Sequence, residues 1–283
     1  MPKAASRPLA RRSCRTLGPS KFCPSLIAVP NMTTFVLVHG AWSGASGFRH
    51  VRRLLQSAGH DVFTPSLTGL GERSHLTSPL VGLSTHVRDV SNHVLYEDHQ
   101  DIVLLGFSYG GFVITGALEH IGDRVRHLVF LDAFVPNNGE SMLAHLGQAG
   151  RASAQVGENW LVPSPERKFD DAEEGRWIGE RRGPHPMRCF TEQVYLAQPL
   201  EEFAFTRTYI KATLNPEADV GAEALWRAAR HAQESTAWTY RQIETTHMVA
   251  SNRPKELATM LVLLTNQSSH HVALYLPSEP SDR

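Results

Sequence analysis

The chain has 283 residues, of which 41% are hydrophobic and 20% are charged, and its formal net charge is zero. This composition is typical of a soluble globular protein with one large or two small domains. It provides no overall charge that would favour nucleic acid or an anionic membrane, and no apolar run reaches the roughly 18 residues of a membrane span.

Residues 1–31 differ from the rest of the chain. They contain six Lys or Arg residues and no Asp or Glu, which gives this segment a charge of +6 and leaves −6 for the remainder. Arg-rich, Ser-rich and acid-poor segments are typical of organelle-targeting peptides. We expect instead an unstructured extension ahead of a domain that starts near Met32, and a cytoplasmic location, with organelle targeting as the alternative.

Short apolar, β-branched runs alternate along the chain with segments whose apolar residues recur at helical spacing. Several of the runs are apolar on both faces, which is typical of a mostly parallel sheet covered by helices on both sides. The sequence therefore predicts an α/β fold with a doubly wound sheet. In chain order we predict a strand at 33–38, a helix at 48–58, a strand at 60–67, a helix at 83–96, a strand at 101–107, a helix at 112–121, strands at 125–131 and 207–213, a helix at 222–232, a strand at 237–243 and a helix at 254–264.

Residues 137–206 interrupt this alternation. They are polar, with scattered Trp and Pro, and a stretch of this length is not a bare loop in a compact domain. We interpret it as a small cap inserted into a domain at 32–267, and we interpret residues 268–283 as a weakly structured tail. Three cysteines, at spacings that suit neither a metal site nor a disulfide framework, lead us to expect no metal, no cofactor and a reducing compartment.

The stretch GFSYGG holds a candidate nucleophile. Gly106-Phe107-Ser108-Tyr109-Gly110 matches G-x-S-x-G, and it lies between a predicted strand and a predicted helix, which is the context that this motif requires. A sharp strand-to-helix turn exposes the serine, and glycines on either side let the neighbouring backbone approach. We expect Ser108 to attack an electrophilic carbon, with the start of the next helix favouring an anionic intermediate.

A serine hydroxyl needs a base, and the chain has 15 histidines. His247 is the best placed, because it follows the last predicted strand at the sheet edge where α/β proteins collect catalytic groups. His39 ends the first strand, where it is expected to support the following loop. A carboxylate should orient the base. Asp132, at the end of strand 125–131, is our first choice, and Asp219, on a more polar loop, is the alternative.

The oxyanion of the reaction needs two aimed hydrogen-bond donors. One is expected to be the backbone N–H of Tyr109, which follows the nucleophile. The other is expected to be the N–H of Ala41, in the HGAW loop after the first strand, where Gly40 allows a close approach of the backbone.

Taken together, these residues resemble the α/β-hydrolase superfamily, which uses the same order of serine, acid and histidine. The similarity runs over roughly residues 33–267 and is strongest at FVLVHGAW, LTGLGERSHL, GFSYGG, FLDAFVP and THMV. Within the superfamily the chain looks most like small esterases related to plant methyl-salicylate esterases and hydroxynitrile lyases, and like their bacterial counterparts. That resemblance implies a cap over the active site and small ester substrates.

The chain departs from these relatives at two places. Their acid usually follows the strand equivalent to 207–213, where this chain has Asn215. This supports Asp132, because some branches supply the acid after the preceding strand, and a shifted loop would keep Asp219 available. The lyases carry a threonine in the HG position and a lysine after the histidine, where this chain has Gly40 and Met248.

The sequence therefore predicts a serine hydrolase that cleaves a small carboxylic ester, lactone or thioester through an acyl-enzyme. Two alternatives stay open: a hydroxynitrile-lyase-like enzyme, and a small-molecule binding protein whose triad has decayed. The expected partner is a small-molecule ester, with no nucleic acid and no membrane span, and a homodimer is left open.

Overall fold

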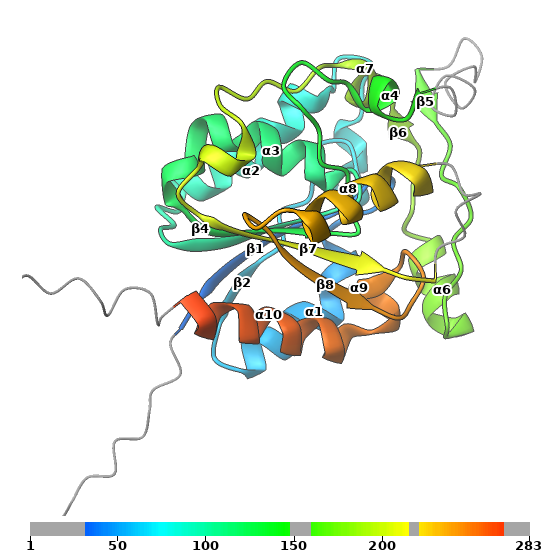
Figure 1. Cartoon of the computed structure of the whole chain (residues 1–283). Helices are drawn as coiled ribbons and strands as arrows, with labels where there is room; N and C mark the ends of the chain where they lie inside the picture. Colours follow the sequence, from blue (N-terminus) through cyan, green and yellow to red (C-terminus); the bar gives the residue numbers. More distant parts are fainter. Residues whose placement is uncertain (1–31, 148–159, 215–220, 269–283) are drawn as a thin grey trace, which may run out of the picture. The chain divides into compact units, whose positions relative to one another are not determined.

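The computed structural model describes residues 32–147, 160–214 and 221–268, all of which belong to one unit, Asn31–Arg283. Six strands form one sheet in the order β2-β1-β3-β4-β7-β8, and every pairing in it is parallel (Figure 1). The strands are β1 (Thr34–Val38), β2 (Asp61–Phe63), β3 (Ile102–Phe107), β4 (Val125–Leu131), β7 (Thr206–Ala212) and β8 (Thr239–Ile243).

Helices cover both faces of this sheet (Figure 1). Their arrangement confirms the α/β doubly wound fold that the sequence predicts. On one face lie α2 (Leu83–Tyr96), α3 (Gly110–Ile121) and α8 (Ala222–Glu234), and on the other lie α1 (Arg49–Ser57), α9 (Val249–Asn252) and α10 (Pro254–Ser268).

The central strands are apolar on both sides because each side faces a helical layer. Along β3, Val103 and Leu105 belong to the core that includes α1 and α10, whereas Leu104 belongs to the core that includes α2 and α3. All three side chains are fully buried. Burial of each such side chain contributes about 1.5–3 kcal/mol relative to exposure, so the two cores stabilise the central strands from both faces.

Most predicted elements appear with ends shifted by one to four residues, and the largest error concerns the predicted strand at 60–67. Only Asp61–Phe63 pairs with β1, and β2 is an edge strand of the sheet. The chain then leaves the sheet. Leu67 is buried in the following loop, and its backbone N–H donates to the ring of His39 at 3.1 Å. A buried loop and a buried strand leave the same apolar signal in the sequence.

The segment predicted as a cap contains short elements between β4 and β7. None of its described helices is longer than α6, and its role as a cap remains a prediction. These elements are α4 (Met142–His145), β5 (Leu161–Val162), α6 (Ala172–Gly179), β6 (His185–Pro186), α7 (Arg188–Thr191) and the 3-10 helix at Leu200–Glu202, while further 3-10 helices lie at Ala45–Phe48, Gly71–Leu76 and Gly122–Arg124.

The parallel order places the carboxyl ends of all six strands at one edge of the sheet. The loops that begin at His39, Ser108, Asp132 and Thr213 therefore open on the same side, and the loop after β8 joins them. Among the described residues, no helix combines the length and the hydropathy that a bilayer-spanning segment requires.

Candidate active site

The turn between β3 and α3 holds Ser108 in a left-handed backbone conformation, with a φ of 56°. Residues other than glycine rarely adopt this conformation, which costs roughly 1–3 kcal/mol and persists only where the surroundings impose it. Here the N–H of Ser108 donates to the carbonyl of Leu131 at 3.3 Å. The carbonyl of Ser108 accepts from Gly111 and Phe134 at 3.0 and 3.2 Å. The turn is thus tied to α3 and to the chain after β4.

The two glycines of the motif are required by close packing of the backbone. A Cβ atom on Gly106 would lie 2.6 Å from the carbonyl oxygen of Gly110, and one on Gly110 would lie 2.7 Å from that of Val38. Gly40 is also close, since its Cβ would lie 3.0 Å from that of Ser108. The absence of side chains at these positions lets β1, β3 and the start of α3 meet around Ser108.

His247 lies in the loop between β8 and α9, and its ring joins the predicted nucleophile to the predicted acid. Its Nε2 is 3.0 Å from Ser108 Oγ, and its Nδ1 is 2.7 Å from Asp132 Oδ2. The ring of Phe107 packs against the imidazole, with centroids 4.7 Å apart. The structure therefore brings together three residues that are far apart in the sequence, in the order that a nucleophile, base and acid require.

Asp132 ends β4 and is fully buried, with a positive φ of 39°. Its Oδ1 accepts from Lys211 Nζ at 2.7 Å and from the N–H of Ala212 at 3.3 Å, while Oδ2 faces His247. Asn215 and the alternative acid Asp219 lie outside the described residues.

The environment sets the charges of this group of side chains. Burial raises the pKa of Asp132, but its hydrogen bond and charge interaction with His247 and its ion pair with Lys211 lower it overall. Burial is the main cause that lowers the pKa of His247, against the raising effect of Asp132, and the charges of Arg167 and Lys211 lower it further. At pH 7 His247 is therefore mostly neutral, which leaves Nε2 able to accept the proton of Ser108.

The two predicted oxyanion donors lie on either side of Ser108. Ala41 follows β1 in the HGAW loop and is nearly buried, and Tyr109, fully buried, precedes the first residue of α3. In the described part of the chain, neither backbone N–H donates to a turn, loop or side-chain acceptor. Both amides are therefore available to a substrate oxygen.

Sequence reasoning missed Lys211. It lies in the middle of RTYIKAT, which predicts only a buried strand, and the structure buries its side chain completely between Asp132 and the ring of Trp226. A single lysine in an apolar strand indicates a buried ion pair, because a buried ammonium group needs a partner. The sequence offers no means to decide which carboxylate that partner is.

Comparison with known proteins finds a matching family and similar sequences. Residues 35–260 match the model of the alpha/beta hydrolase family. The carbendazim hydrolyzing esterase of Nocardioides sp. (strain SG-4G) is 38% identical over 180 residues, which cover 59% of this chain and 74% of that protein. Methylesterase 8 of Arabidopsis thaliana is 29% identical over 137 residues, which cover 45% of this chain and 46% of that protein.

Solved structures show the same fold. An extracellular alpha/beta-hydrolase from a Paenibacillus species superposes with a TM-score of 0.68 at 22% identity, covering 82% of this chain and 98% of that one. A methylesterase from Arabidopsis superposes with a TM-score of 0.66 at 22% identity, covering 83% of this chain and all of that one.

Buried histidines surround the site and extend beyond it. His39 donates from Nδ1 to the carbonyl of Gly40 at 2.8 Å and so holds the HGAW loop. Burial lowers the pKa of His39, His86 and His127 to about 4, and it lowers that of His185 well below its ordinary value. Each of these groups takes up a proton more readily in the unfolded chain than in the folded one.

We therefore expect the free energy of unfolding to fall as the pH falls from about 6.5 to about 4. Above this window the four imidazoles are neutral in both states, so their contribution is fully present. Within it only the unfolded chain binds the protons, and each group removes up to about 1.4 kcal/mol per pH unit. Urea unfolding at pH 7.5, 6 and 5 measures the slope. His127→Gln should make it shallower and exposed His75→Gln should not, whereas a flat profile would contradict the expectation.

Proposed function

The chain belongs to the alpha/beta hydrolase family, and on this premise we propose that it cleaves a small carboxylic ester with Ser108 as nucleophile. His247 acts as the general base and Asp132 orients it. The observation that carries the proposal is the continuous contact from Ser108 Oγ to His247 Nε2 at 3.0 Å and from His247 Nδ1 to Asp132 at 2.7 Å. The similarity to esterases and methylesterases supports an ester, and a lactone or thioester reacts by the same route.

In the first half of the reaction, Ser108 Oγ attacks the carbonyl carbon of the ester while its proton moves to His247 Nε2. The carbonyl oxygen becomes an oxyanion, which accepts hydrogen bonds from the N–H groups of Ala41 and Tyr109. The imidazolium is stabilised by the negative charge of Asp132. The intermediate then expels the alcohol, which takes the proton from His247, and the acyl group stays on Ser108.

In the second half, water replaces the alcohol. His247 takes a proton from the water molecule, whose oxygen attacks the acyl carbon through a second oxyanion. That intermediate breaks its bond to Ser108 Oγ, and His247 returns the proton to the serine. The products are the carboxylic acid and the free enzyme, and no cofactor is needed for this balance.

Hydrolysis is favoured over the lyase alternative by the groups beside the nucleophile. Gly40 offers no side-chain hydroxyl, and buried Met248 follows His247 where the resemblance implies a lysine in the lyases. The contact of Asp132 with His247 also supports an enzyme over a binding protein with a decayed triad, because it supplies the carboxylate that Asn215 cannot. Cytoplasmic location and a homodimer remain proposals, which fractionation and light scattering would test.

We expect a fluorophosphonate probe to label Ser108 in the folded protein, because the probe reacts only with a serine whose proton is removed by a base. Mass spectrometry of the labelled peptide and hydrolysis of p-nitrophenyl acetate are the measurements. Ser108→Ala should abolish both signals. Ester turnover that survives this substitution would show that the reaction does not pass through Ser108.

Asp132→Asn should reduce kcat by about 10⁴, because an amide cannot hold His247 in the correct tautomer or stabilise its cation. Asp219→Asn is the matched control and should change kcat less than about threefold. Steady-state kinetics with the same ester compare the two variants. The reverse result, with loss only in Asp219→Asn, would assign the acid to the alternative loop.

Lys211→Met should shift the acid limb of the kcat/KM profile to higher pH. Lys211 lowers the pKa of His247, so its removal raises that pKa, and His247 then stays protonated and inactive up to a higher pH. Exposed Lys255→Met serves as the control and should leave the limb in place. A limb that stays or moves to lower pH in Lys211→Met would refute this role of the lysine.

A further inference from the structure

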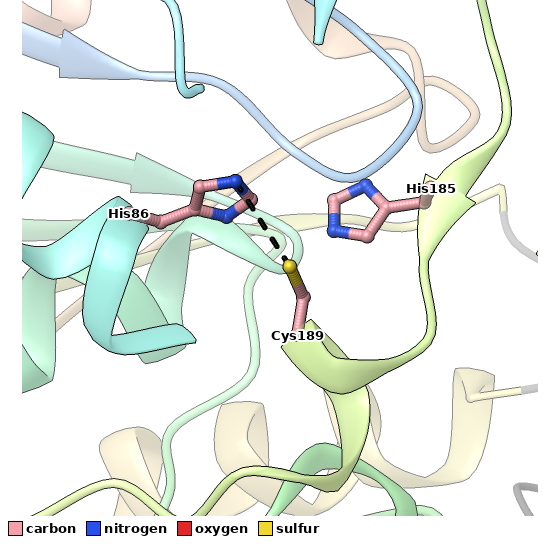
Figure 2. Close-up of side chains that lie close together, drawn as sticks. All are labelled: His86, His185 and Cys189. Carbon is pink, nitrogen blue, oxygen red and sulfur yellow. Dashed lines mark hydrogen bonds between the residues drawn. The ribbon is translucent and has the colours of Figure 1, made fainter. Parts of the chain in front are cut away.

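Three buried side chains from distant parts of the chain meet one another (Figure 2). His86 comes from α2, His185 from β6 and Cys189 from α7, and the three point toward one another. Their nitrogen and sulfur atoms lie within 4.8 Å of one another. Two imidazoles and a thiol are ligand types that zinc takes in proteins, so metal binding is the first interpretation to test.

The hydrogen bonds of His185 do not fit metal ligation, although the one that His86 donates would allow ligation through Nδ1. His86 Nε2 lies 2.9 Å from the carbonyl oxygen of Thr68, to which it must donate its proton. The backbone N–H of Trp42 donates to His185 Nδ1 at 3.2 Å, so the proton of neutral His185 is on Nε2. A metal-bound histidine instead donates its second N–H to an acceptor. At His185 that second nitrogen faces a donor.

The other nitrogen of His86 holds the residue next to the proposed nucleophile. Because Nε2 carries the proton, His86 Nδ1 accepts from the hydroxyl of Tyr109 at 3.0 Å. The side chain of Tyr109 is fully buried, and its backbone N–H is one of the two proposed oxyanion donors. His86 therefore anchors this half of the oxyanion site to α2.

His185 contacts the other half. Trp42, which donates to it, directly follows Ala41, the residue that carries the second proposed donor. Trp42 has a φ of 62°, which a bulky residue keeps only when its surroundings impose it. Its indole Nε1 donates to the carbonyl of Val162 at 3.0 Å. Both anchors of Trp42 thus come from the segment that is predicted to form the cap.

The two histidines also contact each other and the same tyrosine ring. The ring centroids of His86 and His185 are 5.6 Å apart, and that of Tyr109 lies 5.8 and 5.0 Å from them. Cys189 Sγ lies 3.9 Å from His86 Nε2, and Phe190 stacks on His185 at 4.6 Å. A shift of one imidazole therefore displaces groups on both sides of the oxyanion site.

We propose that His86 and His185 are positioning residues that together hold the two oxyanion amides at the separation the reaction needs. His86 acts through Tyr109, and His185 acts through Trp42 and Ala41. This inference rests on the proposed ester hydrolysis, because the amides have this role only in that reaction. It also couples the predicted cap to catalysis, since His185 belongs to that segment.

Each imidazole accepts a hydrogen bond only while it is uncharged. Burial lowers the pKa of His86 to about 4 and that of His185 well below its ordinary value, so both are neutral at pH 7. The thiol of Cys189 is likewise uncharged, because burial raises its pKa to about 12. The cluster therefore consists of neutral groups at neutral pH, in agreement with the hydrogen bonds that define it.

Two substitutions of His185 test the proposal. In His185→Asn the side-chain oxygen takes the place of Nδ1 and still accepts from Trp42, whereas His185→Leu fills the space without an acceptor. Removal of one oxyanion donor costs about 10²–10³ in kcat, so we expect a displaced donor in His185→Leu to lower kcat by about tenfold or more. KM should change less than about twofold. In His185→Asn, kcat should stay within about threefold of the original.

A trifluoromethyl ketone inhibitor provides a second measurement. It forms an oxyanion with the serine, so in His185→Leu its Ki should rise by the factor by which kcat/KM falls. His127 is a buried histidine at the opposite end of β4, and His127→Leu is the matched control. It should change neither kcat/KM nor the Ki of the inhibitor. Tyr109→Phe removes only the hydroxyl from which His86 accepts a hydrogen bond. It should also lower kcat with little change in KM. It tests the same proposal if His185→Leu does not fold.

Three results would overturn the proposal: an unchanged kcat in both His185→Leu and Tyr109→Phe, an equal loss in His185→Leu and His185→Asn, or one tightly bound zinc per chain that His185→Leu abolishes. Failure of the proposed hydrolysis is distinguished by the wild-type protein itself. In that case the fluorophosphonate probe does not label Ser108, whatever the histidine variants do.

Discussion

The carboxylate of Asp132 has no exposed surface, and the arrangement of the site depends on how its charge is compensated. An isolated carboxylate is too costly to bury, so its oxygens need charged or polar partners in fixed directions. Lys211 reaches it from β7, and His247 reaches it from the loop after β8. Both contacts require β7 to lie beside β4 and the last loop to fold back over the sheet edge. The buried charge therefore fixes where the loop after β8 docks on the sheet edge.

Three of the five non-glycine residues with positive φ in the described part of the chain lie at the same edge of the sheet. Ser108, Asp132 and Trp42 all have positive φ values, although none is glycine. Each such residue costs roughly 1–3 kcal/mol, so the surrounding structure must hold all three. The two cores supply this energy because β1, β3 and β4 are buried on both faces. A rigid centre of the sheet therefore allows three adjacent loops to keep unfavourable backbone conformations. Those loops carry the proposed nucleophile, the proposed acid and one proposed oxyanion donor.

The fold could be predicted from the sequence because each kind of element keeps its own apolar pattern. A helix that faces one apolar layer keeps the helical spacing of its apolar residues, and a strand that faces two layers forms a short continuous apolar run. Ser108 as candidate nucleophile and His247 as candidate base could be proposed from the sequence, because a motif selects the first and a position after a strand selects the second among the histidines. The structure brings the two side chains together. Asp132 could be preferred over Asp219 because it directly follows an apolar strand. Which acid contacts the base depends on tertiary structure, so the sequence alone could not decide it. Lys211 and the His86–His185 pair could not be assigned, since each takes its meaning from a partner that is distant in the chain. No local pattern reports which buried polar groups share hydrogen bonds.

The predicted cap contacts the sheet domain at two places, and substitutions at the two should have different effects. At the first place, His185 and the carbonyl of Val162 accept hydrogen bonds from Trp42 of the HGAW loop. At the second, Arg49 of α1 pairs with Glu174 of α6 and lies 3.6 Å from the ring centre of Trp177. The first anchor contacts the residue next to a proposed oxyanion donor, whereas the second joins the segment to α1. Substitutions at His185 should therefore affect the rate of the proposed reaction more than substitutions at Glu174 or Trp177.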